Sequence, residues 1–205
     1  MFTTVKDTAV SEFTEKKSRF ISTISPVADE GMAKAFISRV KALYPDSRHN
    51  CFAYRLHTPF VERFSDDGEP AGTAGMPILG VLKTNALFNV CVVVTRYFGG
   101  VLLGAGGLCR AYSRGASDVV LAAQKVVYKP ACFLQINLPY TALDAFTNSL
   151  NHKPGLKILG IEYTDKVSIS ISLEAGLKDE VLKLLMDLTR GKGLVTAITP
   201  GFDTF

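Results

Sequence analysis

The sequence lacks the patterns that mark several classes of protein. Its apolar runs fall far short of the roughly 20 residues that a membrane-spanning helix needs, and its polar first 17 residues do not resemble a secretory signal. Its four cysteines contain no C-x-x-C pair and its three histidines no H-x-x-x-H pattern, which argues against a zinc site. We therefore expect a cytoplasmic protein with reduced thiols, no metal, no cofactor and no membrane contact.

Signatures of common catalytic centres are also missing. No G-x-S-x-G motif is present to activate a serine, so we interpret Ser113 and Ser117 as surface residues. His49 and His57 stand at opposite ends of one expected strand without a partner nearby in the sequence, which favours a polar strand-end role over general-base catalysis. Cys109 is interpreted as a packed residue rather than a reactive thiol. The sequence therefore indicates no catalytic residue.

The composition is that of an ordinary globular protein. Of the 205 residues, 47% are apolar and 20% are charged. The net charge of +4 permits a nucleic-acid partner without requiring one. This charge is unevenly divided, because residues 1–129 carry 16 Lys/Arg against 11 Asp/Glu, whereas residues 130–205 carry 7 against 8. We expect contacts with a polyanion to involve residues 1–129.

The hydrophobic pattern of residues 1–129 predicts alternating strands and helices. The first 16 residues are expected to form an arm or an edge strand, and Asp29 is expected to cap the first helix. A loop dense in Gly, Pro and Asp covers residues 64–77. The remaining elements are expected as strands at 19–25, 50–57 and 88–96 and as helices at 76–85 and 105–124.

The pattern becomes simpler after Lys129-Pro130. It predicts strands at 132–138, 155–163, 167–173 and 194–199, with one helix after the first strand and another before the last. The resulting order, β-α-β-β-α-β, is typical of a ferredoxin-like split βαβ unit. We therefore expect an α+β protein with two domains, residues 1–129 and 130–205.

A glycine-rich segment, TRYFGGVLLGAGGLCRAYSRGA at residues 95–116, separates an expected buried strand from a helix. Backbone N–H groups at the glycines and the positive end of the helix can hold a phosphate, and arginines facing solvent or the loop mouth would attract it. The segment lacks the Lys and Ser/Thr of a P-loop. The alternative is that the glycines only allow close packing. The predicted phosphate- or RNA-binding residues are Arg96, Tyr97, Gly99, Gly100, Gly106, Gly107, Arg110 and Arg114.

A second unusual segment is SDDGEPAGTAG, which begins at Ser65. Its carboxylates can bind Mg²⁺, or they can belong to a tight turn before a helix that Thr73 caps. Long ordered loops are also often functional. We interpret the segment as a recognition loop formed by Asp66, Asp67, Gly68, Glu69 and Pro70, with the turn and the metal site as alternatives.

Taken together, SDDGEPAGTAGMPIL and VVVTRYFGGVLLGAGGLCRAYSRGA resemble the IMPACT family, and the length and second domain resemble its bacterial YigZ-type branch. The resemblance implies a first domain of the type found in ribosomal proteins, domain IV of elongation factor G and GHMP kinases. It implies a second domain similar to the last domain of elongation factor G. Eukaryotic members regulate translation and carry a further N-terminal interaction domain without a counterpart here, so their kinase-pathway role is not carried over.

Three functions are compatible with these features. The first is an RNA- or ribosome-binding protein that modulates translation without a catalytic centre. The second is a protein-interaction regulator. The third is an enzyme that binds a small phosphorylated ligand at the glycine-rich loop, with Asp66 or Asp67 as base or metal ligand.

Overall fold

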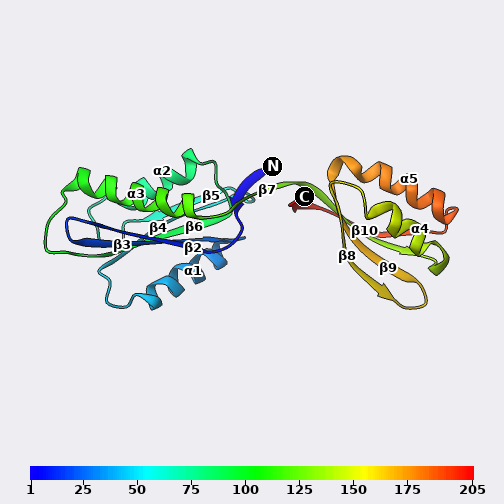
Figure 1. The fold of residues 1–205 in the computed structure, drawn as a ribbon, viewed down its shortest axis with the longest axis horizontal. Coiled ribbons are helices and arrows are strands. Elements are labelled where there is room, and N and C mark those ends of the chain that lie inside the picture. The colour runs from blue at the N-terminus through cyan, green and yellow to red at the C-terminus, as the bar shows by residue number, and fades with distance from the viewer. The chain divides into compact units, whose positions relative to one another are not determined.

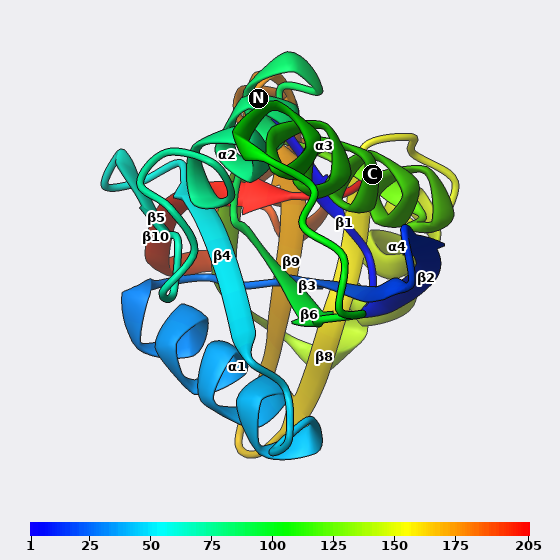
Figure 2. The same cartoon turned by 90° about the vertical axis from the view of Figure 1, so that its left-hand side faces the viewer.

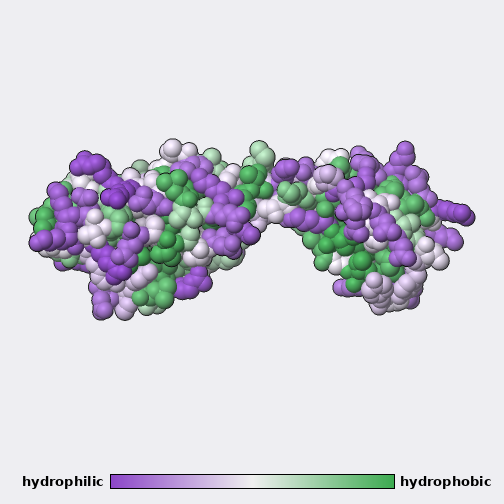
Figure 3. Space-filling model, in the orientation of Figure 1, coloured by the Kyte–Doolittle hydropathy of each residue, from purple (hydrophilic) through white to green (hydrophobic).

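The computed structural model describes all 205 residues, which form two compact units (Figure 1). One unit comprises Phe2–Val126, and the other comprises Val127–Phe205 together with Met1. The fold contains five α-helices and two sheets, an α+β arrangement. No helix is both long and apolar enough to cross a membrane. On the face drawn in Figure 3, hydrophilic residues alternate with small apolar patches on each unit.

The first unit is built on an antiparallel sheet with strand order β2-β3-β6-β4-β5. Its central strand β6 is buried from Val90 to Arg96, as its run of valines predicts. An additional strand, β1 (Phe2–Val5), lies beside the start of β6, where Thr3 O accepts a hydrogen bond from Phe88 N. The five sheet strands are β2 (Ala9–Glu15), β3 (Ser18–Pro26), β4 (His49–Leu56), β5 (Val61–Ser65) and β6 (Val90–Tyr97).

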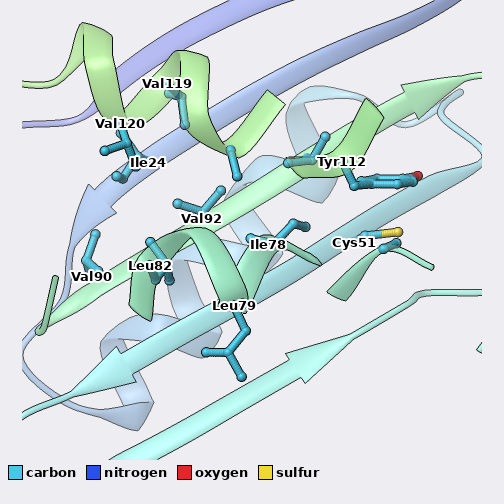
Figure 4. Packing of buried hydrophobic residues seen from close by; sticks show 14 of the residues in the cluster. Ile24, Cys51, Ile78, Leu79, Leu82, Val90, Val92, Tyr112, Val119 and Val120 are labelled. Carbon is cyan, nitrogen blue, oxygen red and sulfur yellow. The ribbon is translucent and has the colours of Figure 1, made fainter. Parts of the chain in front are cut away.

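Helices cover both faces of this sheet. Figure 2 shows α1 (Glu30–Leu43) on one side and α2 (Gly75–Thr84) and α3 (Ala105–Ala122) on the other. Asp29 caps α1 as expected, since its Oδ1 accepts a hydrogen bond of 2.7 Å from Met32 N. Figure 4 shows apolar side chains of α2 and α3, among them Ile78, Leu82, Val119 and Val120, packed over the sheet. The sheet therefore has an apolar core on each face.

The second unit has the element order expected from its sequence. Its sheet is antiparallel with strand order β10-β7-β9-β8, and α4 and α5 pack against the apolar face that contains Ile136 and Ile169. The last strand continues four residues beyond its expected end, because its pairing with β7 persists to Asp203. The elements are β7 (Lys125–Leu138), α4 (Tyr140–Leu150), β8 (Leu156–Tyr163), β9 (Val167–Glu174), a 3-10 turn (Ala175–Leu177), α5 (Lys178–Thr189) and β10 (Leu194–Asp203).

Candidate functional site

The register of the first sheet brings several functional side chains together. His49 of β4 lies directly opposite Arg96 of β6, and Phe20 of β3 lies opposite Arg96 on its other side. Directly paired residues project from the same face of a sheet. This face carries α3, so the ends of three strands lie beside the loop that leads into that helix.

A pocket of about 380 Å³ opens at this position. The loop 98–104, the first turn of α3, the end of β6 and residues 68–70 form its walls. Its polar lining consists of Arg48, His49, Glu69 and Arg96, and its apolar lining consists of Pro70, Phe98, Leu102, Leu103 and Leu108. The pocket therefore combines charged and apolar lining residues.

A buried ion pair borders the pocket. Arg96 Nη1 donates to Glu69 Oε1 at 2.6 Å, and the Tyr112 hydroxyl donates to the same oxygen at 2.9 Å. Burial raises the pKa of Tyr112, so its hydroxyl remains a donor. Arg96 is only 4% exposed, and its Nη2 donates to Ser18 Oγ at 3.3 Å. Arg96 therefore does not face solvent, because the register of β6 points its side chain toward Glu69, where it lines the pocket beside the glycine-rich loop.

His49 is fixed by a backbone contact. Its Nδ1 lies 2.8 Å from the carbonyl oxygen of Asp67, and a carbonyl oxygen only accepts hydrogen bonds, so Nδ1 carries the hydrogen. Nε2 then lies on the side of Glu69, at 4.0 Å from Oε1. Gly68 is required at this turn, because its φ is +89° and an added Cβ would lie 3.3 Å from His49 Nδ1. The imidazole is thus held against the pocket.

Asp66 stabilises the loop and the start of α2. Its carboxylate accepts backbone hydrogen bonds from Gly72, Ala74 and Gly75 at 2.9, 3.0 and 2.8 Å. Burial acts to raise the pKa of Asp66, but the three donors outweigh burial and hold that pKa below its ordinary value. The cap of α2 is therefore Asp66 rather than the expected Thr73, whose hydroxyl donates to the carbonyl of Pro70 instead.

The other acidic side chains of the expected recognition loop also have partners within the protein. Asp67 accepts hydrogen bonds from Asn50 N at 2.7 Å and from Lys41 Nζ at 2.8 Å. Glu69 is held by Arg96 and Tyr112. The three carboxylates therefore serve the architecture of the loop, and residues 68–70 supply one wall of the pocket.

The glycines of the segment have two different roles. An added Cβ at Gly99 would lie 2.0 Å from the carbonyl carbon of Lys17, and one at Gly115 would lie 2.6 Å from Ser22 Oγ. Close packing therefore requires glycine at both positions. Gly106 meets only the end of the flexible Arg110 side chain, at 3.5 Å, so it leaves the first turn of α3 open. The close-packing interpretation therefore holds at Gly99 and Gly115, and phosphate binding at the segment stays a prediction.

The N-terminus of α3 is uncapped by any side chain. Gly104 precedes the helix with a φ of +76°, and Ala105 and Gly106 are exposed. The first N–H groups of a helix have no partner within it and carry its positive dipole end. This turn can accept an anion from solvent.

Exposed cations lie near the first turns of α3, and five of them are called the basic face: Lys16, Lys17, Arg48, Arg110 and Arg114. Four of the five make no ion pair, while Arg114 lies 3.9 Å from Glu15 and 3.5 Å from Asp118. A second pocket of about 230 Å³ has Lys16, Arg110 and Arg114 in its lining, together with Glu15. Leu103 lines both pockets, so they are neighbours.

Sequence reasoning missed three members of the basic face. Lys16 and Lys17 form the tip of the β2–β3 hairpin with φ of 45° and 66°, a conformation usually occupied by Gly, Asn or Asp. Arg48 precedes β4 and is joined to β6 by the bond from its N to Arg96 O. Tyr97, an expected member of the site, is half-buried with the Arg19 guanidinium 5.8 Å from its ring, whereas the adjacent Phe98 lines the pocket and is 40% exposed.

These features define a two-unit α+β protein with a basic, glycine-rich helix start in its first unit. Residues 16–120 match the Impact N-terminal domain, and residues 136–192 match a domain of unknown function, DUF1949. The chain belongs to the IMPACT family.

The chain is also similar to named relatives and to a solved structure. The chain is 37% identical over 190 residues to IMPACT family member YvyE of Bacillus subtilis, which covers 92% of this chain and 87% of the relative. It is 36% identical over 186 residues to IMPACT family member YigZ of Escherichia coli, with 89% and 91% covered. Protein IMPACT of Homo sapiens matches over 100 residues at 34% identity, with 44% and 30% covered. A crystal structure described as that of an hypothetical protein superimposes with a TM-score of 0.66 at 32% identity and covers 97% of both chains.

Proposed function

We propose that this protein binds RNA of the translation machinery through its basic face and thereby modulates translation. The observation that carries the proposal is the gathering of unpaired, exposed cations around the open N-terminus of α3. Lys and Arg side chains and helix N-termini are the groups that contact phosphates in nucleic-acid complexes. Membership of a family whose eukaryotic members regulate translation supports the choice of partner.

The two units support the same proposal. We propose residues 1–129 as the IMPACT-type domain and residues 130–205 as a ferredoxin-like domain, because the second sheet has the order β10-β7-β9-β8 with both helices on one face. Domains of these two types, similar to domain IV and the last domain of elongation factor G, suit a protein that contacts the ribosome. Likeness of fold is analogy, so the basic face carries the functional argument.

The proposal is tested by RNA binding in a salt series. The protein and its Lys16→Glu/Arg110→Glu variant are titrated with a single-stranded RNA of about 20 nucleotides at several salt concentrations. We expect the variant to bind at least about tenfold more weakly at low salt and to show a less steep salt dependence, because phosphate contacts release counterions.

The matched control is Lys34→Glu/Arg39→Glu, which reverses two exposed charges on α1, on the other side of the sheet. It lowers the net charge equally but leaves the basic face intact. Equal RNA binding by the two double variants would show that the basic face is not the binding site.

A further inference from the structure

The pocket beside the basic face has a volume and an apolar lining that binding of an RNA backbone does not require. A surface that follows an RNA backbone needs exposed cations and no concave pocket. This pocket is instead a concavity, open to solvent, of about 380 Å³, within the range of about 300–1,000 Å³ typical of small-molecule sites. Its lining combines charged groups with apolar groups, and a nucleotide likewise combines a charged phosphate with a flat base.

The charged side favours an anion. The charge of Glu69 is offset by Arg96 at 2.6 Å. Arg48, which is exposed and unpaired, then contributes an uncompensated positive charge, and the open first turn of α3 adds N–H donors. A second, independent feature is Arg96 itself, which lines the pocket while 4% exposed and has an Nε without a hydrogen-bond partner.

The apolar side favours a flat ring. Phe98 is 40% exposed and Leu102 is 82% exposed, and both belong to the loop that precedes α3. The Phe98 ring already stacks near the Arg96 guanidinium, at 5.5 Å, which orients it at the pocket wall. Bases stack on aromatic side chains without regard to their sequence.

We propose that this pocket binds one nucleotide bearing a terminal phosphomonoester, with its phosphate at Arg48 and the first turn of α3 and its base against Phe98 and Leu102. A phosphomonoester carries a charge of about −1.5 to −2 at pH 7, whereas an internal phosphodiester carries one, so the pocket distinguishes an end from the interior of a strand. The nucleotide belongs either to a phosphorylated RNA end or to a free nucleoside monophosphate. The first source rests on the proposed RNA-binding function, and the second does not.

The test compares ligands that differ only in the terminal phosphate. An eight-nucleotide RNA is prepared with a 5′-phosphate, with a 3′-phosphate and with neither, and AMP serves as the free nucleotide. We expect binding by one of the phosphorylated strands, by AMP, or by a phosphorylated strand and AMP. A phosphorylated strand that binds is expected to bind about tenfold more tightly than the unphosphorylated strand, because it gains one charge-assisted contact.

Two variants locate the binding. Phe98→Ala and Arg48→Ala are expected to weaken phosphomonoester binding about tenfold, because each removes one half of the pocket. Their controls are Phe60→Ala, which truncates a phenylalanine that is 66% exposed, and Arg63→Ala, which removes an exposed arginine of β5. Circular dichroism melting of each variant verifies that it is folded.

The outcomes separate the two proposals. If phosphorylated and unphosphorylated RNA bind equally and AMP does not bind, the nucleotide pocket is wrong and the RNA-binding face stands. If AMP binds and no RNA does, the pocket stands with a free nucleotide as its ligand, and the proposed function fails. Phosphomonoester binding that survives both Phe98→Ala and Arg48→Ala would overturn the placement in this pocket.

Discussion

Arg96 and Glu69, 27 residues apart in the sequence, form an ion pair of 2.6 Å beneath the glycine-rich loop, with side chains that are 5% and 4% exposed. A buried ion pair is not by itself a source of stability, because both charges lose their hydration. Its importance here is positional. It connects the loop at residues 68–70 to the end of β6, and residues of both segments line one pocket.

Removing the charge of Glu69 tests this connection. We expect Glu69→Gln to lower the free energy of unfolding by about 3–5 kcal/mol, because it leaves the guanidinium of Arg96 buried without a counter-ion. Urea unfolding at pH 7 measures the change. Glu12→Gln, which breaks an exposed pair with Arg19, is the control and should have little effect. Equal, small losses in both variants would contradict the assigned role of the buried pair.

The hydrogen bonds accepted by Asp66 are expected to make the stability of the protein depend on pH. Its pKa is lowered in the folded protein, so its carboxylate contributes stability that is fully present above its unfolded pKa of about 4 and is lost as pH falls through the folded value. We expect Asp66→Asn to cost about 1–3 kcal/mol at pH 7 and to flatten the decline in unfolding free energy between about pH 5 and 2. Asp46→Asn, at an exposed residue without a partner, is the control. Parallel curves for the protein and Asp66→Asn would exclude this role.

Substitution by alanine is expected to change stability in opposite directions at two glycines of the glycine-rich segment. Gly99→Ala places a Cβ at 2.0 Å from the Lys17 backbone, so we expect a loss of about 1–3 kcal/mol and weaker RNA binding as the Lys16–Lys17 tip moves. Gly106→Ala meets no backbone, and alanine favours the helix, so it should be neutral or stabilising by up to about 1 kcal/mol. Thermal unfolding of the two variants decides the matter, and similar melting temperatures would show that the contact at Gly99 is not essential.

The four cysteines are expected to differ in thiol reactivity according to their burial. Burial raises the pKa of Cys51 to about 12 and also raises the pKa of Cys91, and both thiols are fully buried. Figure 4 shows Cys51 beside the Tyr112 ring. We expect these two thiols to react with a thiol reagent at pH 8 only after unfolding, while the partly exposed Cys109 and Cys132 react in the native state. Four rapidly reacting thiols in the native protein would contradict the described core.

Much of the secondary structure could be predicted from the sequence, because its signals are local. The apolar run of β6 and the helical spacing of α3 identified both elements to within a few residues. β5 (Val61–Ser65) was missed, since an edge strand that contains Glu62 and Arg63 lacks a clear apolar alternation.

The site could be predicted only in part. Residues of the glycine-rich segment were found because glycine and arginine are recognisable by type. The burial of Arg96 was not, because it depends on the register of β6 and on Glu69 from a distant loop. Lys16 and Lys17 gave no turn signal, since lysine is unusual at positive φ, and Arg48 reaches the pocket only through the pairing of β4 with β6.

The most direct test of the proposed function is co-sedimentation with purified ribosomes across a salt series, with the Arg110→Glu/Arg114→Glu variant measured in parallel. We predict that the protein sediments with ribosomes at low salt, that binding falls steeply as salt rises, and that the variant remains in the supernatant. Absence of the protein from the ribosomal pellet at low salt, or equal sedimentation of the variant, would contradict ribosome binding through the basic face.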